Sequence, residues 1–244
     1  MAGTRELISI VDADADLADL LDAGDRELAR REALTRVRTL SVGEWNAAEA
    51  IEPDIHHRGF LIISGLLSRE VDVLGRRCVE LLGDGDVLRP WRWDPDGSHV
   101  HAEVGWMVLE RTRLAVLDHG LVQRMNRWPQ LGVELFARGT RRAHSLAVAL
   151  AIAHHQHVED RLLLTLWHIA ERWGRVTQDG IVIPISLSHQ RLADLIGGTR
   201  PSVTAAVGQL TRDEKLSRLQ DGAWVLHGTP PAVLRHHKLV AAMS

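Results

Sequence analysis

The sequence of 244 residues predicts an α+β protein with a β-roll of short strands, then a long helix, then two short helices and a β-hairpin. Three observations predict this order. Short apolar segments punctuated by glycines occupy residues 36–118, small and apolar residues recur at helical spacing over 129–157, and an Asp-Gly turn separates two apolar segments at 221–222. Before them, acids that alternate with apolar residues predict a capped helix over 16–23 and a second helix through Arg36, because the acids do not have calcium-loop spacing.

The clearest motif is LSHQRLADLIGGTRPSVTAAVGQL at residues 187–210, which predicts two short helices joined by a glycine turn. Ser188 is placed to cap the first helix, and the Gly-Gly pair at 197–198 to end it. Thr199 is placed to cap the second helix, which tolerates Pro201 because first-turn amides need no partner within the helix. The predicted buried stripes are Leu192, Leu195 and Ile196 on the first helix and Val203, Val207 and Leu210 on the second.

A hairpin follows this pair of helices at once. Segments 216–219 and 223–227 flank Asp221-Gly222, a strong hairpin signal, and residues 181–186 read as a short strand that can pair with it. Two short helices around a glycine turn also occur in proteins that never touch nucleic acid. The added hairpin favours a winged helix-turn-helix, whose second helix enters the major groove with its small, polar and cationic N-terminal end.

The order of these parts resembles the Crp/Fnr family of bacterial transcription regulators, over about residues 40–230. The segment VEDRLLLTLWHIAERW at 158–173 is similar to the helix that leads into the family's winged domain, and LSHQRLADLIG follows in register. The resemblance implies an N-terminal β-roll of the cyclic-nucleotide-binding-like jelly-roll type, a long dimerisation helix and a C-terminal winged helix-turn-helix. It also implies double-stranded DNA, a second copy of the chain (a homodimer) and RNA polymerase as partners.

By this resemblance Ser188 and Gln190 fall where the family contacts phosphates, and Arg200 falls where it places an arginine that reads a base. Pro201 replaces an acidic base contact of many relatives, and Ala205 replaces a second arginine of some, so the operator sequence stays open. The expected DNA-binding residues are Ser188, His189, Gln190, Thr199, Arg200, Pro201, Ser202, Ala205, Gln209 and Arg218. The expected domains are a helical segment 1–35, an effector-type β-roll 36–125, a dimerisation helix 126–157, a winged domain 158–231 and a tail 232–244.

The turn LLGDGDVL at 81–88 resembles the one that precedes the family's effector site, but the residues after this turn differ from the family's pattern. The Gly-Glu and Arg-Ser or Arg-Thr pairs of cyclic-nucleotide binders are missing, and Pro90 and Pro95 remove amides that a phosphate cradle uses. We therefore expect no control by cyclic AMP. A different small-molecule effector is one interpretation of an apolar and cationic group, and a core or domain contact is the other; the group is Arg89, Trp91, Arg92 and Trp93.

We predict no metal, no cofactor and no catalytic residue. Cys78 is the single cysteine, which excludes an internal disulfide and a four-thiolate iron–sulfur cluster, and its apolar surroundings predict a buried thiol. His99 and His101 lack a third ligand, and on one helix His154 and His157 share a face but lack the carboxylate spacing of catalytic zinc motifs. Ordinary histidines are the preferred interpretation in both places.

The helix predicted over residues 129–157 has an apolar stripe containing small residues, which favours close approach of a second helix. Packing on its own β-roll is the alternative for part of it. The arginines at 138, 141 and 142 are expected to form a solvated face or to pair with acids of the β-roll.

The formal charge is −3, and residues 159–244 hold ten Lys or Arg against eight acids. Because this excess is small, specific contacts must matter for DNA binding. No apolar run reaches the ~18 residues of a membrane span, and the start of the sequence is acidic, so a cytoplasmic protein is expected.

The sequence thus predicts a homodimeric, sequence-specific DNA-binding transcription regulator. Two alternatives remain open: an effector-independent architectural DNA-binding protein, and a metal-dependent enzyme that uses the histidines.

Overall fold

The computed structural model describes residues 6–47, 57–90 and 102–230. The chain forms two compact units, residues 1–145 and 146–244, and the division falls within one long helix. The expected mixed fold, with an antiparallel sheet in the N-terminal part and helix-turn-helix elements in the C-terminal part, is confirmed. The finer domain boundaries stay predictions.

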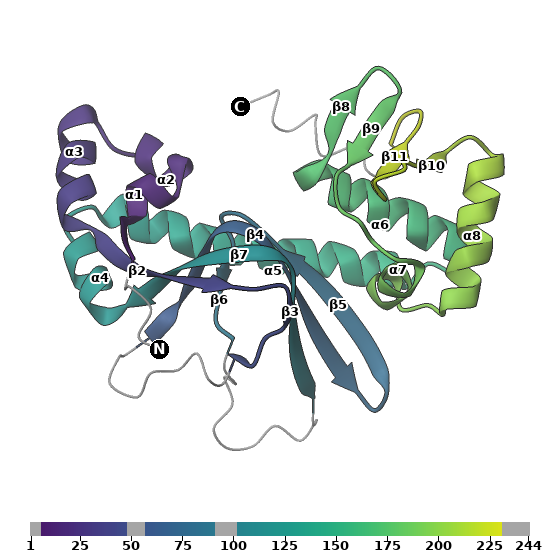
Figure 1. Cartoon of the computed structure of the whole chain (residues 1–244), viewed down its shortest axis with the longest axis horizontal. Coiled ribbons are helices and arrows are strands. Elements are labelled where there is room, and N and C mark those ends of the chain that lie inside the picture. Colours follow the sequence, from purple (N-terminus) through teal and green to yellow (C-terminus); the bar gives the residue numbers. More distant parts are fainter. Residues whose placement is uncertain (1–5, 48–56, 91–101, 231–244) are drawn as a thin grey trace. The chain divides into compact units, whose positions relative to one another are not determined.

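The first unit contains a sheet with helices at one end (Figure 1). Its strands are β1 (Leu7–Ser9), β2 (Leu34–Leu40), β3 (Gly43–Glu44), β4 (His57–Val73), β5 (Arg76–Leu82), β6 (Val87–Leu88) and β7 (Glu103–Asp118). Its helices are α1 (Ile10–Ala13), α2 (Ala15–Asp19), α3 (Ala23–Glu32), α4 (His119–Met125) and the first part of α5 (Pro129–Ala153). All described pairings are antiparallel, in the order β1-β2-β7-β4-β5, with β3 on β7 and β6 on β4.

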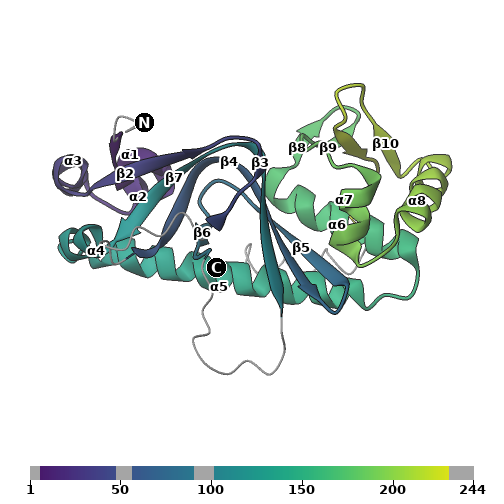
Figure 2. The same cartoon turned by 60° about the horizontal axis from the view of Figure 1, so that its bottom comes forward.

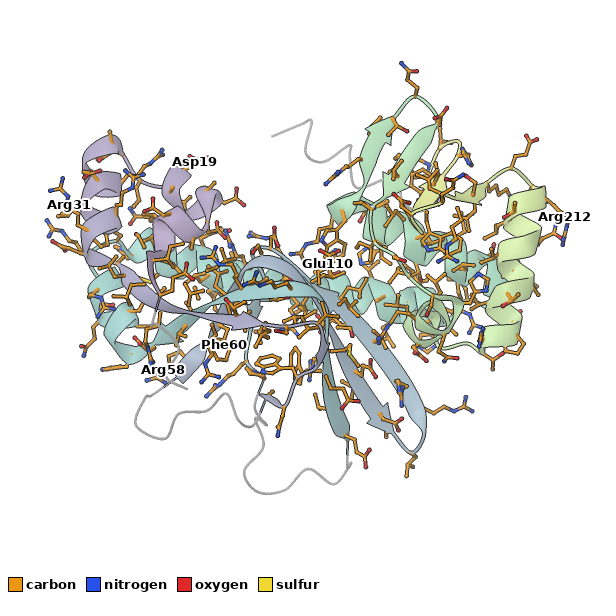
Figure 3. All side chains as sticks on the ribbon, in the orientation of Figure 1. Asp19, Arg31, Arg58, Phe60, Glu110 and Arg212 are labelled. Carbon is orange, nitrogen blue, oxygen red and sulfur yellow. The ribbon has the colours of Figure 1, made fainter. Side chains whose placement is uncertain are left out.

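The central strands β4 and β7 are apolar on both faces because each face covers a different core. Along β4, Phe60 and Ile62 join the core inside the roll, whereas Leu61 joins a second core with α1, α2, α4 and the start of α5. Figure 3 shows Phe60 among the side chains inside the roll. Leu114 and Ala115 on β7 divide between the two cores in the same way. A strand with alternate side chains in two cores reads as a continuous apolar run.

The glycines of residues 36–118 were expected to punctuate short strands, but Gly65 does not end a strand. It lies inside β4 at an irregularity of the register with β7. Its φ is +105°, and a Cβ there would approach the carbonyl oxygen of Arg111 to 2.5 Å. The glycine therefore permits a close approach of backbones at a bulge, where it bends the strand and does not end it.

The prediction of a buried Cys78 is wrong, because its side chain is exposed. The strand itself is present as β5, and the error lies in the face of the strand. Val79 and Leu81 point into the protein, so the alternating residues Cys78 and Glu80 point to the other face. Partial burial, and then the carboxylate of Glu80, raise the pKa of the thiol above its usual value.

The N-terminal helices begin at two aspartates, and their bounds differ from the predicted 16–23 and 24–36. The Asp14 carboxylate accepts a hydrogen bond from the amide of Leu17 and caps α2, while Asp22 accepts one from Asp25 and caps α3. Capping at Asp22 starts a new helix where the prediction continued the old one. Residues after Ala33 then pair as β2, with Leu7–Ser9 alongside.

Two arginines of α5 fasten this helix to the rest of the first unit, so they do not form the solvated face that was one of the two expectations. Arg138 binds both carboxylate oxygens of Asp14, and its Nη1 donates to the Gly85 carbonyl at 3.1 Å. Arg142 binds Glu80 with Nε–Oε1 and Nη2–Oε2 distances of 2.6 and 2.7 Å. Arg141 is the exposed member of the three. Figure 2 shows the first part of α5 running beside the roll.

The second unit has three helices against a small sheet. The helices are α6 (Val158–Trp173), α7 (His189–Ile196) and α8 (Arg200–Arg212), and the strands are β8 (Arg175–Thr177), β9 (Gly180–Ile183), β10 (Leu216–Arg218) and β11 (Trp224–Leu226). The sheet order is β10-β11-β9-β8, all antiparallel, so the predicted strand near residue 181 does pair with the hairpin. The sequence prediction missed β8. Among the described helices, none is both long and apolar enough to cross a lipid bilayer.

We predict that Asp14→Asn lowers the free energy of unfolding by about 3 kcal/mol, the low end for a broken buried ion pair, because Glu134 still faces Arg138. Asparagine still caps α2, so the change isolates the charge. Burial raises the Asp14 pKa, but hydrogen bonds and charge from Arg138 outweigh it and leave that pKa below its usual value. The stabilisation is therefore present above the unfolded-state pKa and is lost as pH falls through the folded-state pKa.

Urea unfolding at pH 7 and in acid measures this difference. The control is Asp16→Asn, whose side chain is 88% exposed although it lies 3.8 Å from Arg138, and which should cost under about 1 kcal/mol. Equal losses in the two variants would contradict the assignment.

Candidate nucleic-acid interface

The first helix of the predicted motif, α7, has the expected ends. The Ser188 hydroxyl oxygen accepts the Arg191 amide at 3.2 Å, and Gly197 ends the helix in the left-handed conformation with φ +61°. Leu192 and Ile196 are buried, while Leu195 is partly buried. The predicted cap, turn and buried face of this helix are confirmed.

The second helix, α8, begins at a reciprocal capping box. The Thr199 amide donates to Ser202 Oγ at 3.1 Å, and the Ser202 amide donates back to Thr199 Oγ1. The Ser202 hydroxyl also donates to the Thr199 carbonyl at 2.8 Å. Pro201 lies in the first turn, as predicted. The cap therefore holds the start of α8, where Arg200 lies, in one conformation.

Burial on one side of α8 determines what its other side exposes. Val203, Ala206 and Leu210 are buried against the domain, with α6 and α7 as the neighbouring helices. The exposed residues near the N-terminus of α8 are Arg200, Pro201, Thr204 and Ala205. Arg200 has no hydrogen-bond or ion-pair partner for its guanidinium in the described part of the chain. The surface thus presents an unpaired cation at a helix N-terminus, where the helix dipole also favours anions.

Behind this surface, a polar network joins α7, α8 and the hairpin. His189 Nδ1 lies 2.9 Å from Thr204 Oγ1, and the Thr204 hydroxyl donates to the Arg200 carbonyl at 2.9 Å. The His189 ring stacks on Trp224, with centroids 6.1 Å apart. Burial first, then the charges of Arg218 and Arg200, lower the pKa of His189 below its usual value. The sequence prediction named His189 but missed Thr204 and Trp224, although the spacing of Thr204 four residues after Arg200 on the exposed face was visible.

The hairpin of β10 and β11, the wing of this domain, carries Arg218. The guanidinium carbon of Arg218 lies 5.0 Å from the Trp224 ring centroid. The Trp224 indole donates to the Leu187 carbonyl at 3.2 Å, so the ring is fixed at the junction of hairpin and helices. Gly222 adopts φ +91° in the predicted Asp-Gly turn. The exposed Arg218 therefore stands on a rigid support.

Two predicted contact residues have amides that are already engaged in the free protein. Gln190 Nε2 donates to Asp194 at 3.0 Å. Gln209 donates to Asp213 at 2.8 Å and accepts from Arg212 at 2.7 Å. Figure 3 shows Arg212 at the outer edge of α8. These bonds are exposed, so exchanging them for a DNA contact costs little.

The predicted effector group is described only at Arg89, which is exposed; Trp91, Arg92 and Trp93 lie outside the described residues. The described interior of the roll holds an aromatic cluster that the sequence prediction missed. Trp45 packs edge-on against Phe60 and Trp106, with ring centroids 6.2 and 5.7 Å apart. These aromatic residues come from three different strands or loops, so no local pattern reveals their proximity.

The histidines do not gather at one point in the described structure. Helix α5 ends at Ala153, so His154 lies beyond it, while His157 occupies the N-cap position of α6 without a capping side-chain hydrogen bond. The two therefore do not share the face of one helix as the sequence prediction supposed. Among residues 6–47, 57–90 and 102–230, no three His, Cys, Asp or Glu side chains are placed to hold a metal ion. His99 and His101 lie outside those ranges.

Comparison with known proteins agrees with the geometry of the second unit. Residues 160–227 match the family model described as a Crp-like helix-turn-helix domain. The C-terminal domain is therefore similar to Crp-like helix-turn-helix domains. The global nitrogen regulator of Synechococcus elongatus is 40% identical over 62 residues, which are 25% of this chain and 28% of that protein. The chain spans less than half the length of the curated relatives it matches.

Solved structures extend the similarity of fold beyond the Crp-like domain. A cyclic nucleotide-binding domain containing protein from Listeria monocytogenes has a TM-score of 0.64 at 16% identity, covering 86% of this chain and 95% of that one. The c-di-GMP responsive global regulator CLP of Xanthomonas campestris has a TM-score of 0.59 at 19% identity, covering 85% and 100%. The predicted resemblance to Crp/Fnr regulators is therefore confirmed.

Proposed function

We propose that this protein is a transcription regulator that binds a near-palindromic operator as a homodimer and is not controlled by cyclic AMP. The observation that carries the proposal is the exposed, unpaired Arg200 at the capped N-terminus of α8 in a Crp-like domain. Two copies, each with α8 in a major groove, require half-sites about one helical turn, ~34 Å, apart.

Arg200 is the proposed base reader, and guanine is its preferred base because O6 and N7 accept both arms of a guanidinium. Pro201 and Ala205 beside it offer no side-chain hydrogen bond, so their contacts with bases are limited to apolar ones such as a thymine methyl.

The proposed phosphate contacts come from residues around the two caps and from the hairpin. The Thr199 and Ser202 hydroxyls both make hydrogen bonds of the α8 cap in the free protein, so a phosphate contact requires one of these bonds to break. The Ser188 hydroxyl oxygen accepts the Arg191 amide in the α7 cap, so its own hydrogen remains available to donate to a phosphate. With Gln190 and, on the wing, Arg218, these groups fix the register on DNA.

The proposed dimer contact is an exposed apolar seam on α5. Val133, Phe136 and Leu150 are 67%, 78% and 62% exposed, and Leu146 is 37% exposed. They are separated by steps of three, ten and four residues, each a sum of three- and four-residue helical steps, with small residues between. This is the pattern of helices that pack side by side. The proposed occupant is the same seam of a second copy, because Arg138 and Arg142 already hold another face of α5 on the roll.

We predict that Arg200→Ala weakens operator binding by ~1–3 kcal/mol and relaxes discrimination at one base pair. Gln190→Ala should weaken binding to every sequence alike, because a phosphate contact carries no sequence information. Selection of bound fragments from random DNA provides the operator, and competition binding on single-base variants measures both effects. If both variants lower the affinity for all DNA sequences equally, Arg200 does not read a base.

We predict that Phe136→Glu raises the dimer dissociation constant at least tenfold, or ~1.4 kcal/mol, because it places a charge in the seam. Sedimentation velocity over a concentration series measures this change, and operator affinity should fall with it. The control is Val176→Glu, an 86% exposed apolar residue of β8 outside the seam. If the dimer is equally stable in both variants, the seam is not the dimer contact.

We predict that cyclic AMP produces no saturable micromolar binding in calorimetry, because residues 88–101 lack the ribose-binding and phosphate-binding pairs. Operator affinity should also be the same with and without the nucleotide. Saturable heat together with a change in operator affinity would overturn this part of the proposal.

A further inference from the structure

The hydrogen bonds of Thr204 determine which nitrogen of His189 carries a proton. The Thr204 hydroxyl has one hydrogen and donates it to the Arg200 carbonyl at 2.9 Å. It must therefore accept at its 2.9 Å contact with His189 Nδ1. We assign Nδ1 as protonated on this ground, so in the neutral ring Nε2 carries only a lone pair.

The second nitrogen, Nε2, is open at the surface of the interface. It makes no hydrogen bond within the described residues, and it is not among the buried side-chain atoms that lack a partner. Stacking on Trp224 and the bond to Thr204 hold the ring in one orientation. His189 is also the first residue of α7, directly after the cap residue Ser188.

The charges that face this ring come from two other elements. Arg200 approaches from the start of α8 and Arg218 from β10, whereas Trp224 on β11 carries no charge. Burial first, and then both arginines, disfavour the imidazolium in the free protein. A DNA phosphate next to the ring would oppose the effect of the two arginines, because it would bring negative charge to the same place.

We propose, resting on the function proposed above, that His189 binds a DNA backbone phosphate through Nε2 as the imidazolium, so that each subunit takes up one proton when it binds its operator. A phosphate oxygen only accepts hydrogen bonds, and the neutral ring with its proton on Nδ1 presents another acceptor to it. The contact therefore requires a second proton on the ring. Operator affinity consequently rises as the pH falls.

The test is operator binding by fluorescence anisotropy from pH 6 to 8.5 at constant ionic strength, with the full chain and the selected operator. Between the pKa values of the free and bound ring, affinity should change about tenfold per pH unit for each proton taken up. Calorimetry in buffers of different ionisation enthalpy counts the protons directly. The wild type should take up one more proton per subunit than His189→Gln, which keeps a hydrogen-bond donor but does not titrate.

A second variant tests the assignment of the proton. Thr204→Val keeps the shape and removes the acceptor for Nδ1–H, so the neutral ring is free to carry its proton on Nε2 and donate it to phosphate. Its binding should therefore depend less on pH than that of the wild type. The control is His168→Gln, on α6 of the same domain and 3.3 Å from Glu171, which should leave the proton count unchanged.

The outcomes separate the two proposals. If no operator is selected at any pH, the proposed function fails. If an operator is bound with the same proton uptake in the wild type and in His189→Gln, the function stands and the inference about His189 is overturned.

Discussion

The burial of Val203, Ala206 and Leu210 is the constraint on which the rest of the interface depends. Once these side chains pack into the domain, helical geometry leaves Arg200 and Thr204 on the opposite side. The capping box then sets where the helix starts, and so sets the position of Arg200 relative to the turn. A loss of packing here would rotate the exposed face and move Arg200, the proposed base reader, out of place even if no residue of that face changed.

Helix α5 has two faces of different chemistry, one held by ion pairs and one exposed and apolar. Arg138 is 7% exposed and engaged with Asp14, Glu134 and the Gly85 carbonyl, so it binds α5 to the start of α2 through charge and to the roll through a carbonyl. Phe136, two residues earlier, is 78% exposed and belongs to the apolar seam. A helix that is bound on one face and apolar on another cannot exchange the two faces without leaving a guanidinium and a carboxylate buried and unpaired. The ion pairs therefore fix which face of α5 stays exposed as the apolar seam.

The parts that sequence reasoning predicted well are those controlled by local chemistry. The caps at Ser188 and Thr199 and the Asp-Gly turn each involve residues within four positions of one another, so their signals are complete in the sequence. The failures need distant information. Gly65 marks a bulge because Arg111 passes close to it. The two alternatives for Arg138, solvated or paired with an acid, were left open because its partner Asp14 lies 124 residues away. The site follows the same division, since Arg200 was found from the motif while the support of His189 by Trp224 depends on the folded hairpin.

Residues 159–244 hold only a small excess of Lys and Arg over acids, so each positive charge at the candidate interface contributes a large share of the total. Lys215 lies 3.9 Å from Asp213, and Arg212 is bound to Gln209, so neither stands as open as Arg200. The salt dependence of DNA binding scales with the number of phosphates neutralised, and a surface with few open cations neutralises few. The additional imidazolium proposed for each subunit would then form a larger share of the neutralising charge than it would on a strongly basic protein. Burial, and then the charges of Arg218 and Arg200, lower the pKa of His189, so the proposed phosphate contact would couple the charge of this ring to the presence of DNA.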